Sequence, residues 1–135
     1  MGHMKPILYI TALALAGMNL SAQAQQLDCT NPMSQVEMTG CAAQGYEAAD
    51  AELNAVWPDA MAQARRMDDG MDWAPSNATL LRDAQRAWIT YRDRACEAES
   101  TVMRGGTAQN MVYYGCLERL TRDRTEDLRY FAFVN

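Results

Sequence analysis

The apolar positions along the chain recur at the three- and four-residue steps that are typical of amphipathic helices. From about Ser34 to Arg66 they predict one long helix with a buried stripe made of Tyr46, Ala49, Leu53, Val56, Trp57, Ala60, Ala64 and Met67. Pro58 lies inside this stretch. Because proline lacks an N–H and its ring clashes with the preceding turn, we expect a kink near Asn54 to Trp57.

Two further helices are predicted. Residues 67–77 contain three aspartates, Gly70 and Pro75 and are typical of a loop, after which Ser76 or Asn77 can cap the second helix. This helix should reach about Met103 and bury the stripe Leu81, Ala84, Trp88, Tyr91, Ala95 and Val102. Gly105 and Gly106 end it, and Thr107 is placed to cap the third helix, which should bury Tyr113, Leu117, Leu120, Leu128 and Phe131.

No strand-type alternation of apolar and polar residues is present. The predicted fold class is therefore all-α: a three-helix bundle with a long disulfide-linked helical hairpin and a kinked first helix. Gly105 and Gly106 mark the turn of this predicted hairpin. Cys96 and Cys116 each lie ten residues from Gly106, so an antiparallel hairpin that turns there would place them side by side.

Four cysteines allow three disulfide pairings from sequence alone. The hairpin favours Cys96 with Cys116, and by elimination Cys29 pairs with Cys41 and pins the amino-terminal arm onto the first helix. An even set of cysteines fits an oxidising compartment.

The amino-terminal residues fit export. Met1 to His3 resemble an expression scar; Lys5, the apolar run Pro6 to Leu20 and the small residues 21–24 then form a secretory signal peptide, so residues 1–24 should be removed. No cysteine directly follows the cleavage site, and a lipid anchor is not expected. Residues 25–135 would form one helical domain in the periplasm.

Removing residues 1–24 also removes the only histidine and the only lysine. Eleven basic residues remain of twelve, all arginine, against seventeen acidic residues, which gives a net charge of −6. Nucleic acid is a poor partner for such a surface, whereas a cationic protein would be attracted to it.

The same composition argues against an enzyme. Without histidine, and with its thiols oxidised, the mature chain excludes a Ser-His or Cys-His mechanism. Glu97 and Glu99 lie two apart and do not share a helix face. Asp68, Asp69 and Asp72 around Gly70 do not match an EF-hand, so neither a metal nor a cofactor is predicted.

A set of motifs resembles the LprI family of secreted bacterial proteins, which is named for a mycobacterial lysozyme inhibitor. The motifs are the cysteine frame, Asp50-x-x-Leu53-Asn54, Leu81-x-x-x-Gln85-Arg86-x-Trp88-x-x-x-Arg92-Asp93-x-x-Cys96, Gly105-Gly106 and Leu120-Thr121-x-x-Arg124-x-x-x-Leu128. The resemblance spans Cys29 to about Leu128. It implies a helical domain, export and lysozyme inhibition.

The polar positions of this resemblance are Asp50, Asn54, Gln85, Arg86, Arg92, Asp93 and Arg124. In the favoured interpretation, Arg92 packs on the bundle and pairs with an acid of the first helix such as Asp50, which fixes the register between helices. In the alternative, these groups line a recognition surface.

The favoured function is inhibition of a lysozyme-type muramidase, with contacts from two loops. Trp57 and Trp88 fall on buried stripes, whereas Trp73 joins none. Trp73 is either an exposed aromatic anchor for a partner or a loop tryptophan that caps the bundle. The contact residues would be Asp68, Asp69, Asp72 and Trp73 in one loop and Arg104 in the other. The alternative function is an envelope adaptor or self-associating protein that uses the apolar end Tyr130 to Val134.

Overall fold

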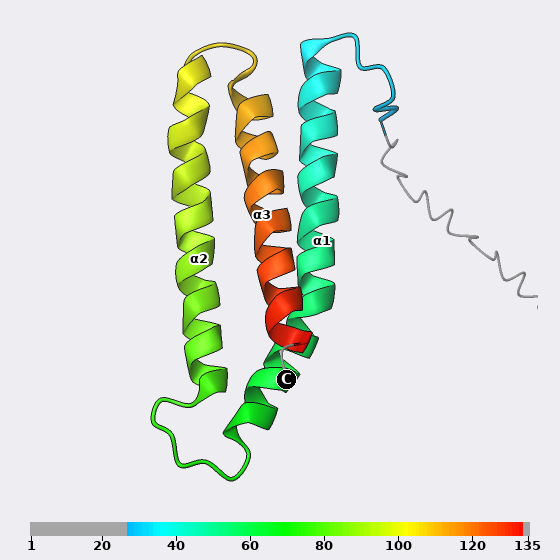
Figure 1. The fold of residues 1–135 in the computed structure, drawn as a ribbon. Coiled ribbons are helices and arrows are strands. Elements are labelled where there is room, and N and C mark those ends of the chain that lie inside the picture. The colour runs from blue at the N-terminus through cyan, green and yellow to red at the C-terminus, as the bar shows by residue number, and fades with distance from the viewer. Residues whose placement is uncertain (1–26, 134–135) are drawn as a thin grey trace, which may run out of the picture.

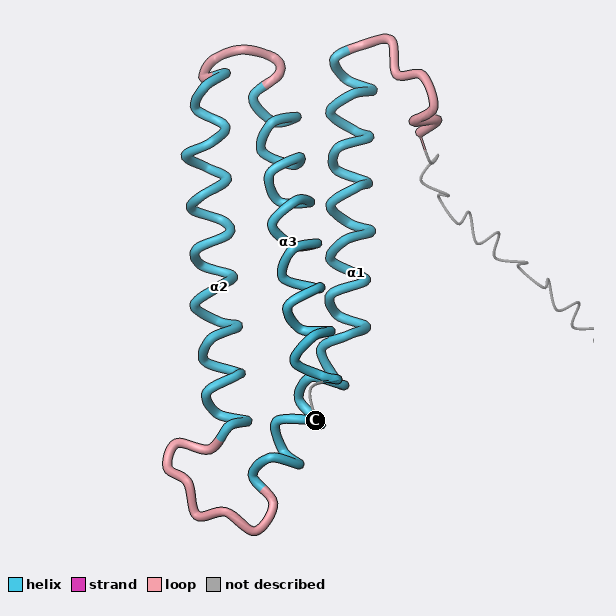
Figure 2. The backbone as a smooth tube through the Cα atoms, viewed as in Figure 1, coloured by secondary structure: helices cyan, strands magenta, loops and turns pink. Residues whose placement is uncertain are grey.

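Three long helices run side by side in a bundle (Figure 1). They are α1 (Gln35–Asp68), α2 (Asn77–Ser100) and α3 (Gln109–Phe133), with a single 3-10 turn, η1 (Thr101–Met103), after α2. This computed structural model describes residues 27–133, so the predicted scar and signal peptide, residues 1–24, lie outside the described residues. All regular structure in the described part is helical, which confirms the predicted all-α bundle (Figure 2).

A complete capping box starts α1. The Ser34 hydroxyl accepts a hydrogen bond from the backbone N–H of Glu37, and the Glu37 carboxylate accepts from the backbone N–H of Ser34 and of Met33. These backbone hydrogen bonds, that from Met33 foremost, lower the pKa of Glu37. Pro58 lies inside the helix, and Figure 1 shows the lower part of α1 leaning toward the base of α2, as the predicted kink requires.

Asp68, the last residue of α1, closes the connection to α2. Its carboxylate accepts from the backbone N–H groups of Asn77 at 2.7 Å and Ala78 at 3.0 Å, while the Ser76 hydroxyl caps Thr79 at 3.2 Å. Desolvation opposes the charged form of Asp68, but these backbone hydrogen bonds prevail and its pKa is lowered. The Asp68 carboxylate and the Ser76 hydroxyl thus accept hydrogen bonds from the three backbone N–H groups at the start of α2.

The turn between α2 and α3 differs in detail from the prediction. The α-helix ends at Ser100 rather than Met103, because the hydroxyls of Ser100 and Thr101 bond back to the carbonyls three residues earlier and the chain tightens into η1. The prediction that Thr107 caps the third helix is wrong. The helix begins at Gln109, so the capping position falls on Ala108.

Both predicted disulfides are present. Cys96 pairs with Cys116 across the α2–α3 hairpin, with 5.4 Å between their Cα atoms, and Cys29 pairs with Cys41. Equal distance from the glycine turn therefore predicted the pairing correctly. The Cys96–Cys116 bridge lies inside the bundle, whereas the Cys29–Cys41 bridge ties an exposed arm to α1.

The core consists of two apolar clusters, one at each end of the bundle. The lower cluster is built from Leu53, Ala60, Met61, Ala64, Ala78, Leu81, Leu128 and Ala132; the upper one is built around Cys96, Cys116 and Leu117. The stripes predicted for α1 and α3 are buried or half-buried, apart from Met67. The stripe predicted for α2 is wrong at Ala84, Tyr91 and Val102, which are exposed, and the buried positions include Gln85 and Arg92 instead.

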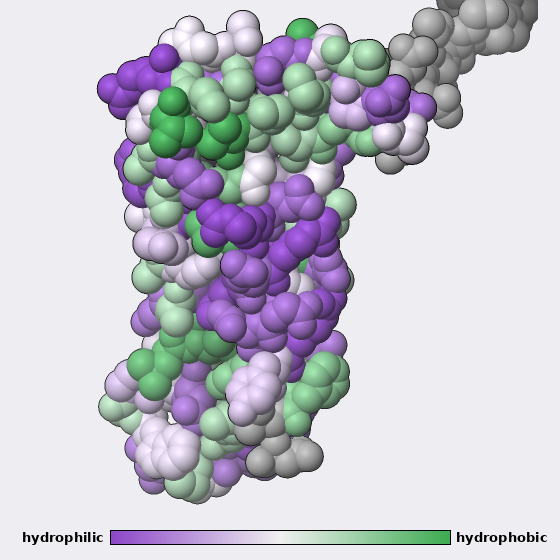
Figure 3. Space-filling view, turned by 45° about the horizontal axis from the view of Figure 1, so that its top comes forward, coloured by the Kyte–Doolittle hydropathy of each residue, from purple (hydrophilic) through white to green (hydrophobic). Residues whose placement is uncertain are grey.

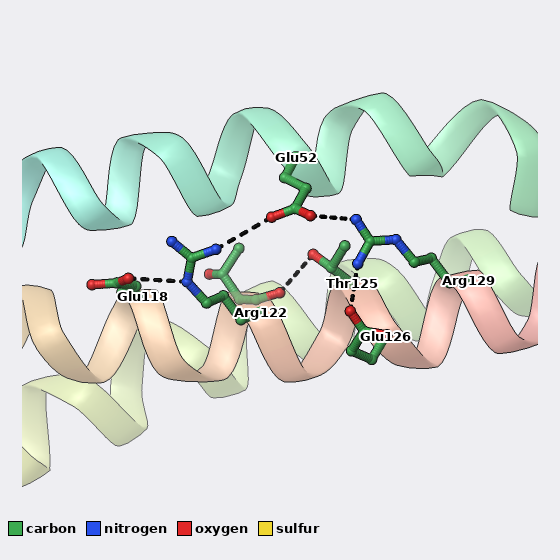
Figure 4. Close-up of polar contacts among 7 residues, drawn as sticks. Glu52, Glu118, Arg122, Thr125, Glu126 and Arg129 are labelled. Atoms are coloured by element: carbon green, nitrogen blue, oxygen red, sulfur yellow. Dashed lines mark hydrogen bonds and ion pairs between the residues drawn. The ribbon is translucent and has the colours of Figure 1, made fainter.

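An ion-pair network joins α1 to the parallel helix α3 between these clusters. Glu52 on α1 lies between Arg122 and Arg129 of α3 and pairs with both (Figure 4). Each arginine also pairs with an acid of its own helix, Glu118 or Glu126. The hydrogen bond from Arg129 is the main cause of a lowered pKa at Glu52, and it outweighs desolvation.

We predict that the two disulfides contribute unequally to stability. Replacing Cys96 and Cys116 together by serine should lower the free energy of unfolding by about 3 kcal/mol, because the bridge restricts the unfolded chain over a separation of 20 residues. Cys29→Ser with Cys41→Ser should cost clearly less, since the freed arm also gains entropy in the folded protein. Urea unfolding under oxidising conditions measures the loss of stability in both double variants. Equal losses would contradict the prediction that the Cys96–Cys116 bridge contributes more.

We also predict an acid-dependent link between α1 and α3. The folded-state pKa of Glu52 lies below its ordinary value of 4.5, so the stabilisation is present above that pH and is lost as the pH falls through the lowered pKa. The difference in urea midpoint between wild type and Glu52→Gln should therefore be largest near neutral pH and shrink below pH 4.5. Glu97→Gln, whose partner Arg94 lies on the same helix, should follow wild type throughout.

Candidate functional site

A buried arginine at the middle of α2 organises the polar part of the bundle. Arg92 is only 8% exposed, and its guanidinium donates to Asp93 at 2.9 Å and pairs with Asp50 of α1 at 3.6 Å. It also reaches the Thr121 hydroxyl of α3 at 3.4 Å. The sequence analysis expected this pair between Arg92 and Asp50, and the structure contains it. One side chain thus links all three helices.

Two aromatic rings complete the surroundings of Arg92. The guanidinium carbon lies 5.4 Å from the ring centre of Tyr46 on α1 and 5.2 Å from that of Trp88 on α2. Desolvation raises the pKa of the Tyr46 phenol, although the charge of Arg92 opposes this. Carboxylates and π faces therefore replace the water that the buried charge loses.

A second polar link lies nearer the lower end. Arg124 of α3 donates from Nε to the Gln85 Oε1 of α2 at 3.0 Å, and desolvation lowers the pKa of this guanidinium. Gln85 is buried, and the nearby Thr125 donates its hydroxyl to the Thr121 carbonyl. With Arg92 these residues form a polar layer between the two apolar clusters.

The polar layer opens to the surface as a groove between α1 and α2 of about 270 Å³. We call it the α1–α2 groove. Its lining combines arginines, amides and indole rings: Asp50, Leu53, Asn54, Trp57, Arg82, Gln85, Arg86, Trp88, Ile89 and Arg92.

The structure brings most of the polar positions of the sequence resemblance into this groove. Of the seven, five line it, and the other two, Asp93 and Arg124, contact lining residues. Asn54 donates to Asp50 at 3.0 Å, and Arg86 lies 3.8 Å from Asp83 in an exposed pair. Trp57 and Trp88 are half-buried, so they serve both the core and the groove.

Sequence reasoning missed Arg82 and Ile89, which also line the groove. The signal was available in the spacing, because residues 82, 86 and 89 follow helical steps of four and three on one face of α2. Neither residue belongs to the motifs that carried the resemblance.

The two loops proposed as contact elements lie at opposite ends of the bundle (Figure 1). The α1–α2 loop is at the lower end and the α2–α3 turn at the upper end, separated by the 24 residues of α2, or roughly 36 Å of helix. Trp73 is 52% exposed, which favours the anchor over the bundle cap, and Asp69 and Asp72 are exposed beside it. Arg104 therefore does not share a compact surface with Trp73, and Asp68 is occupied at the start of α2.

Further exposed apolar side chains lie at both ends of the bundle. Val102 and Met103 are exposed near the α2–α3 turn, and Figure 3 shows hydrophobic surface at that upper end while hydrophilic side chains dominate the middle. At the carboxyl end Tyr130 and Phe133 are each 75% exposed, whereas Phe131 packs against the lower cluster. The predicted apolar end is thus divided between surface and core, and Val134 lies outside the described residues.

Within residues 27–133, no helix combines the length and apolarity needed to cross a membrane. The same residues contain no group of three or more metal-ligating side chains and no free cysteine. The groove lining presents guanidinium, carboxylate, amide and indole groups, which can bind ligands by hydrogen bonds, charge and apolar contact.

The fold and the polar layer define a class of small helical proteins stapled by disulfides. Residues 28–128 match the family described as "Lysozyme inhibitor LprI", and the chain belongs to this family. An uncharacterised protein of Rhizobium meliloti strain 1021 is 42% identical over 113 residues, which cover 81% of each chain. A crystal structure of a DUF1311 family protein from Pseudomonas putida KT2440 has the same fold, with a TM-score of 0.63, 22% identity, and coverage of 78% of this chain and 100% of that one.

We predict that Arg92 is required for stability and that lysine cannot fully replace it. Arg92→Met should lower the free energy of unfolding by about 1–2 kcal/mol, because the buried Thr121 hydroxyl loses its donor and the rings of Tyr46 and Trp88 lose the guanidinium. Arg92→Lys keeps the charge but loses the planar fork and should give an intermediate loss. Arg94→Met, two residues away with an exposed partner, should change stability by less than about 0.5 kcal/mol in the same urea titration.

Proposed function

We propose that this protein binds and inhibits a lysozyme-type muramidase in the periplasm. The supporting observation is its membership of the LprI family over residues 28–128. A signal peptide that is cleaved after Ala24 would direct the chain to an oxidising compartment, where its two disulfides form. The inhibitor acts by occupying the enzyme, without chemistry of its own.

The charge of the protein favours its encounter with such an enzyme. The mature chain would carry a net charge of −6, and lysozyme-type enzymes are commonly cationic, so long-range attraction should speed association and fade with salt. Charge alone does not hold a complex together. A buried anchor surrounded by polar contacts supplies most of the binding free energy in protein interfaces.

The α1–α2 loop is the contact surface we assign. Trp73 presents a large exposed ring, and Asp69 and Asp72 add negative charge beside it. Asp68 holds the loop by capping α2 and thereby presents these side chains on a fixed base. Arg104 at the opposite end could pair with carboxylates in the enzyme cleft, but one compact interface would contain only one of the two ends.

We predict that the purified protein inhibits cell-wall clearance by a c-type lysozyme and that Trp73 carries much of the affinity. Trp73→Ala should weaken binding by more than about 1 kcal/mol, which is at least roughly fivefold. Tyr91→Ala is the matched control, since Tyr91 is 62% exposed on the side of α2. Calorimetry at low and high salt measures affinity, and clearance of cell walls measures inhibition.

The variants at Trp73 and Arg104 show which end of the bundle contacts the enzyme. Unchanged affinity in Trp73→Ala together with loss in Arg104→Ala would move the contact to the α2–α3 turn. Absence of both inhibition and salt-sensitive binding would remove the muramidase proposal altogether.

A second candidate function is that of an envelope adaptor or self-associating protein. It is favoured by the exposed pair Tyr130 and Phe133, which lie three residues apart on one face of α3. This candidate needs neither the groove nor the α1–α2 loop.

A further inference from the structure

We propose that the α1–α2 groove binds a small carboxylate that carries an apolar or ring-shaped body, such as an acidic sugar or a short peptide with a free carboxyl end. The site is on the side of the bundle. It does not depend on muramidase inhibition, and it would stand if that function were absent.

The local charge of the groove is opposite to that of the protein. The whole chain has a net charge of −5, yet the groove lining holds three arginines and one aspartate. Asp50 is already paired with Arg92 and accepts from Asn54, so it does not neutralise the other two arginines. Arg92 is compensated by Asp50 and Asp93, and Arg86 has only the exposed Asp83 beside it. The positive charge that remains at the groove is therefore carried by Arg82 and, in part, by Arg86.

Arg82 and Arg86 are the cations available to a ligand. They lie four residues apart on the exposed face of α2, where like charges repel each other. Arg86 has only an exposed contact with Asp83 at 3.8 Å, and Arg82 forms no ion pair with any residue in the described part of the chain. A carboxylate between them would relieve the repulsion and accept paired hydrogen bonds from the guanidinium groups.

The rest of the groove suits the body of such a ligand. Trp57 and Ile89 provide indole and aliphatic surface, while Trp88 already has Arg92 near its ring. Gln85 has its Oε1 taken by Arg124, so its amide N–H groups remain as donors at the wall. A volume of about 270 Å³ is at the small end for ligand sites and fits one sugar ring or one or two amino acids.

Tryptophan fluorescence can report on this site selectively. The chain has three tryptophans, and Trp73→Phe removes the only one outside the groove, so the two that remain both line it. This variant, folded as the full chain, is the protein to titrate. N-acetylmuramic acid and N-acetylglucosamine are matched probes, because they differ only in the lactyl ether that bears the carboxylate. N-acetyl-D-alanyl-D-alanine and its amide form the equivalent peptide pair.

We expect at least one carboxylate probe to change the fluorescence and to bind at least tenfold more tightly than its neutral partner, with an affinity that falls as salt rises. The responding pair identifies the source as saccharide or peptide. Arg82→Ala with Arg86→Ala should reduce the affinity at least tenfold, and Ile89→Ala should reduce it severalfold. Arg94→Ala, an exposed arginine of the same helix outside the groove, should leave it unchanged.

Three results would overturn the proposal. The first is equal binding of the charged and neutral members of both pairs, and the second is no binding of any probe. The third is an affinity that survives the Arg82 and Arg86 substitutions in a protein with an unchanged circular dichroism spectrum. Because both arginines are exposed, their removal should not unfold the bundle. None of these results bears on lysozyme inhibition, which is measured separately with the enzyme.

Discussion

A single buried guanidinium sets the geometry on which the rest of the structure depends. Arg92 needs partners on every side, because an unpaired charge in a protein interior is expensive. It finds them on all three helices: Asp50 and Tyr46 on α1, Asp93 and Trp88 on α2, and Thr121 on α3. A slip of one helix along another would break several of these contacts at once. The apolar clusters above and below supply the driving force, and Arg92 selects the register in which they meet.

The same constraint explains why a groove lies between α1 and α2. At the groove the facing positions of α1 and α2 include the long side chains of Gln85 and Arg92, whereas the lower cluster includes the small residues Ala60, Ala64 and Ala78. Pro58 then turns the lower part of α1 toward the base of α2 (Figure 1). On its other side α1 is held to α3 by Glu52, Arg122 and Arg129 (Figure 4). The groove is therefore a consequence of how the bundle is held together.

Much of this architecture could be predicted from the sequence, and the failures have a common cause. Helical periodicity located the three helices, and equal spacing about Gly106 identified the Cys96–Cys116 bridge. The stripe of α2 was misplaced because apolar residues such as Tyr91 were assigned to the interior, while the interior contains Gln85 and Arg92. A polar residue becomes a core residue only when its partners on other helices are known. The pairing of Arg92 with Asp50 was predicted because the family motifs drew attention to both residues. The spacing of Arg82, Arg86 and Ile89 places them on one face of α2, but it does not show that this face borders a groove against α1.

The proposed muramidase binding depends on the net charge of the protein, whereas the proposed ligand site depends on the local charge of the α1–α2 groove. A large approaching protein experiences the summed field of the chain, which is acidic, so a cationic enzyme is attracted from a distance. A small ligand in the groove would lie close to Arg82, which has no ion pair in the described part of the chain, and to Arg86, whose only acidic partner is the exposed Asp83. Acids farther away than about 8 Å are screened at physiological salt. A small anion can therefore bind to the side of a protein that repels anions overall. Because the α1–α2 loop and the groove are distinct surfaces, each function can be lost without the other.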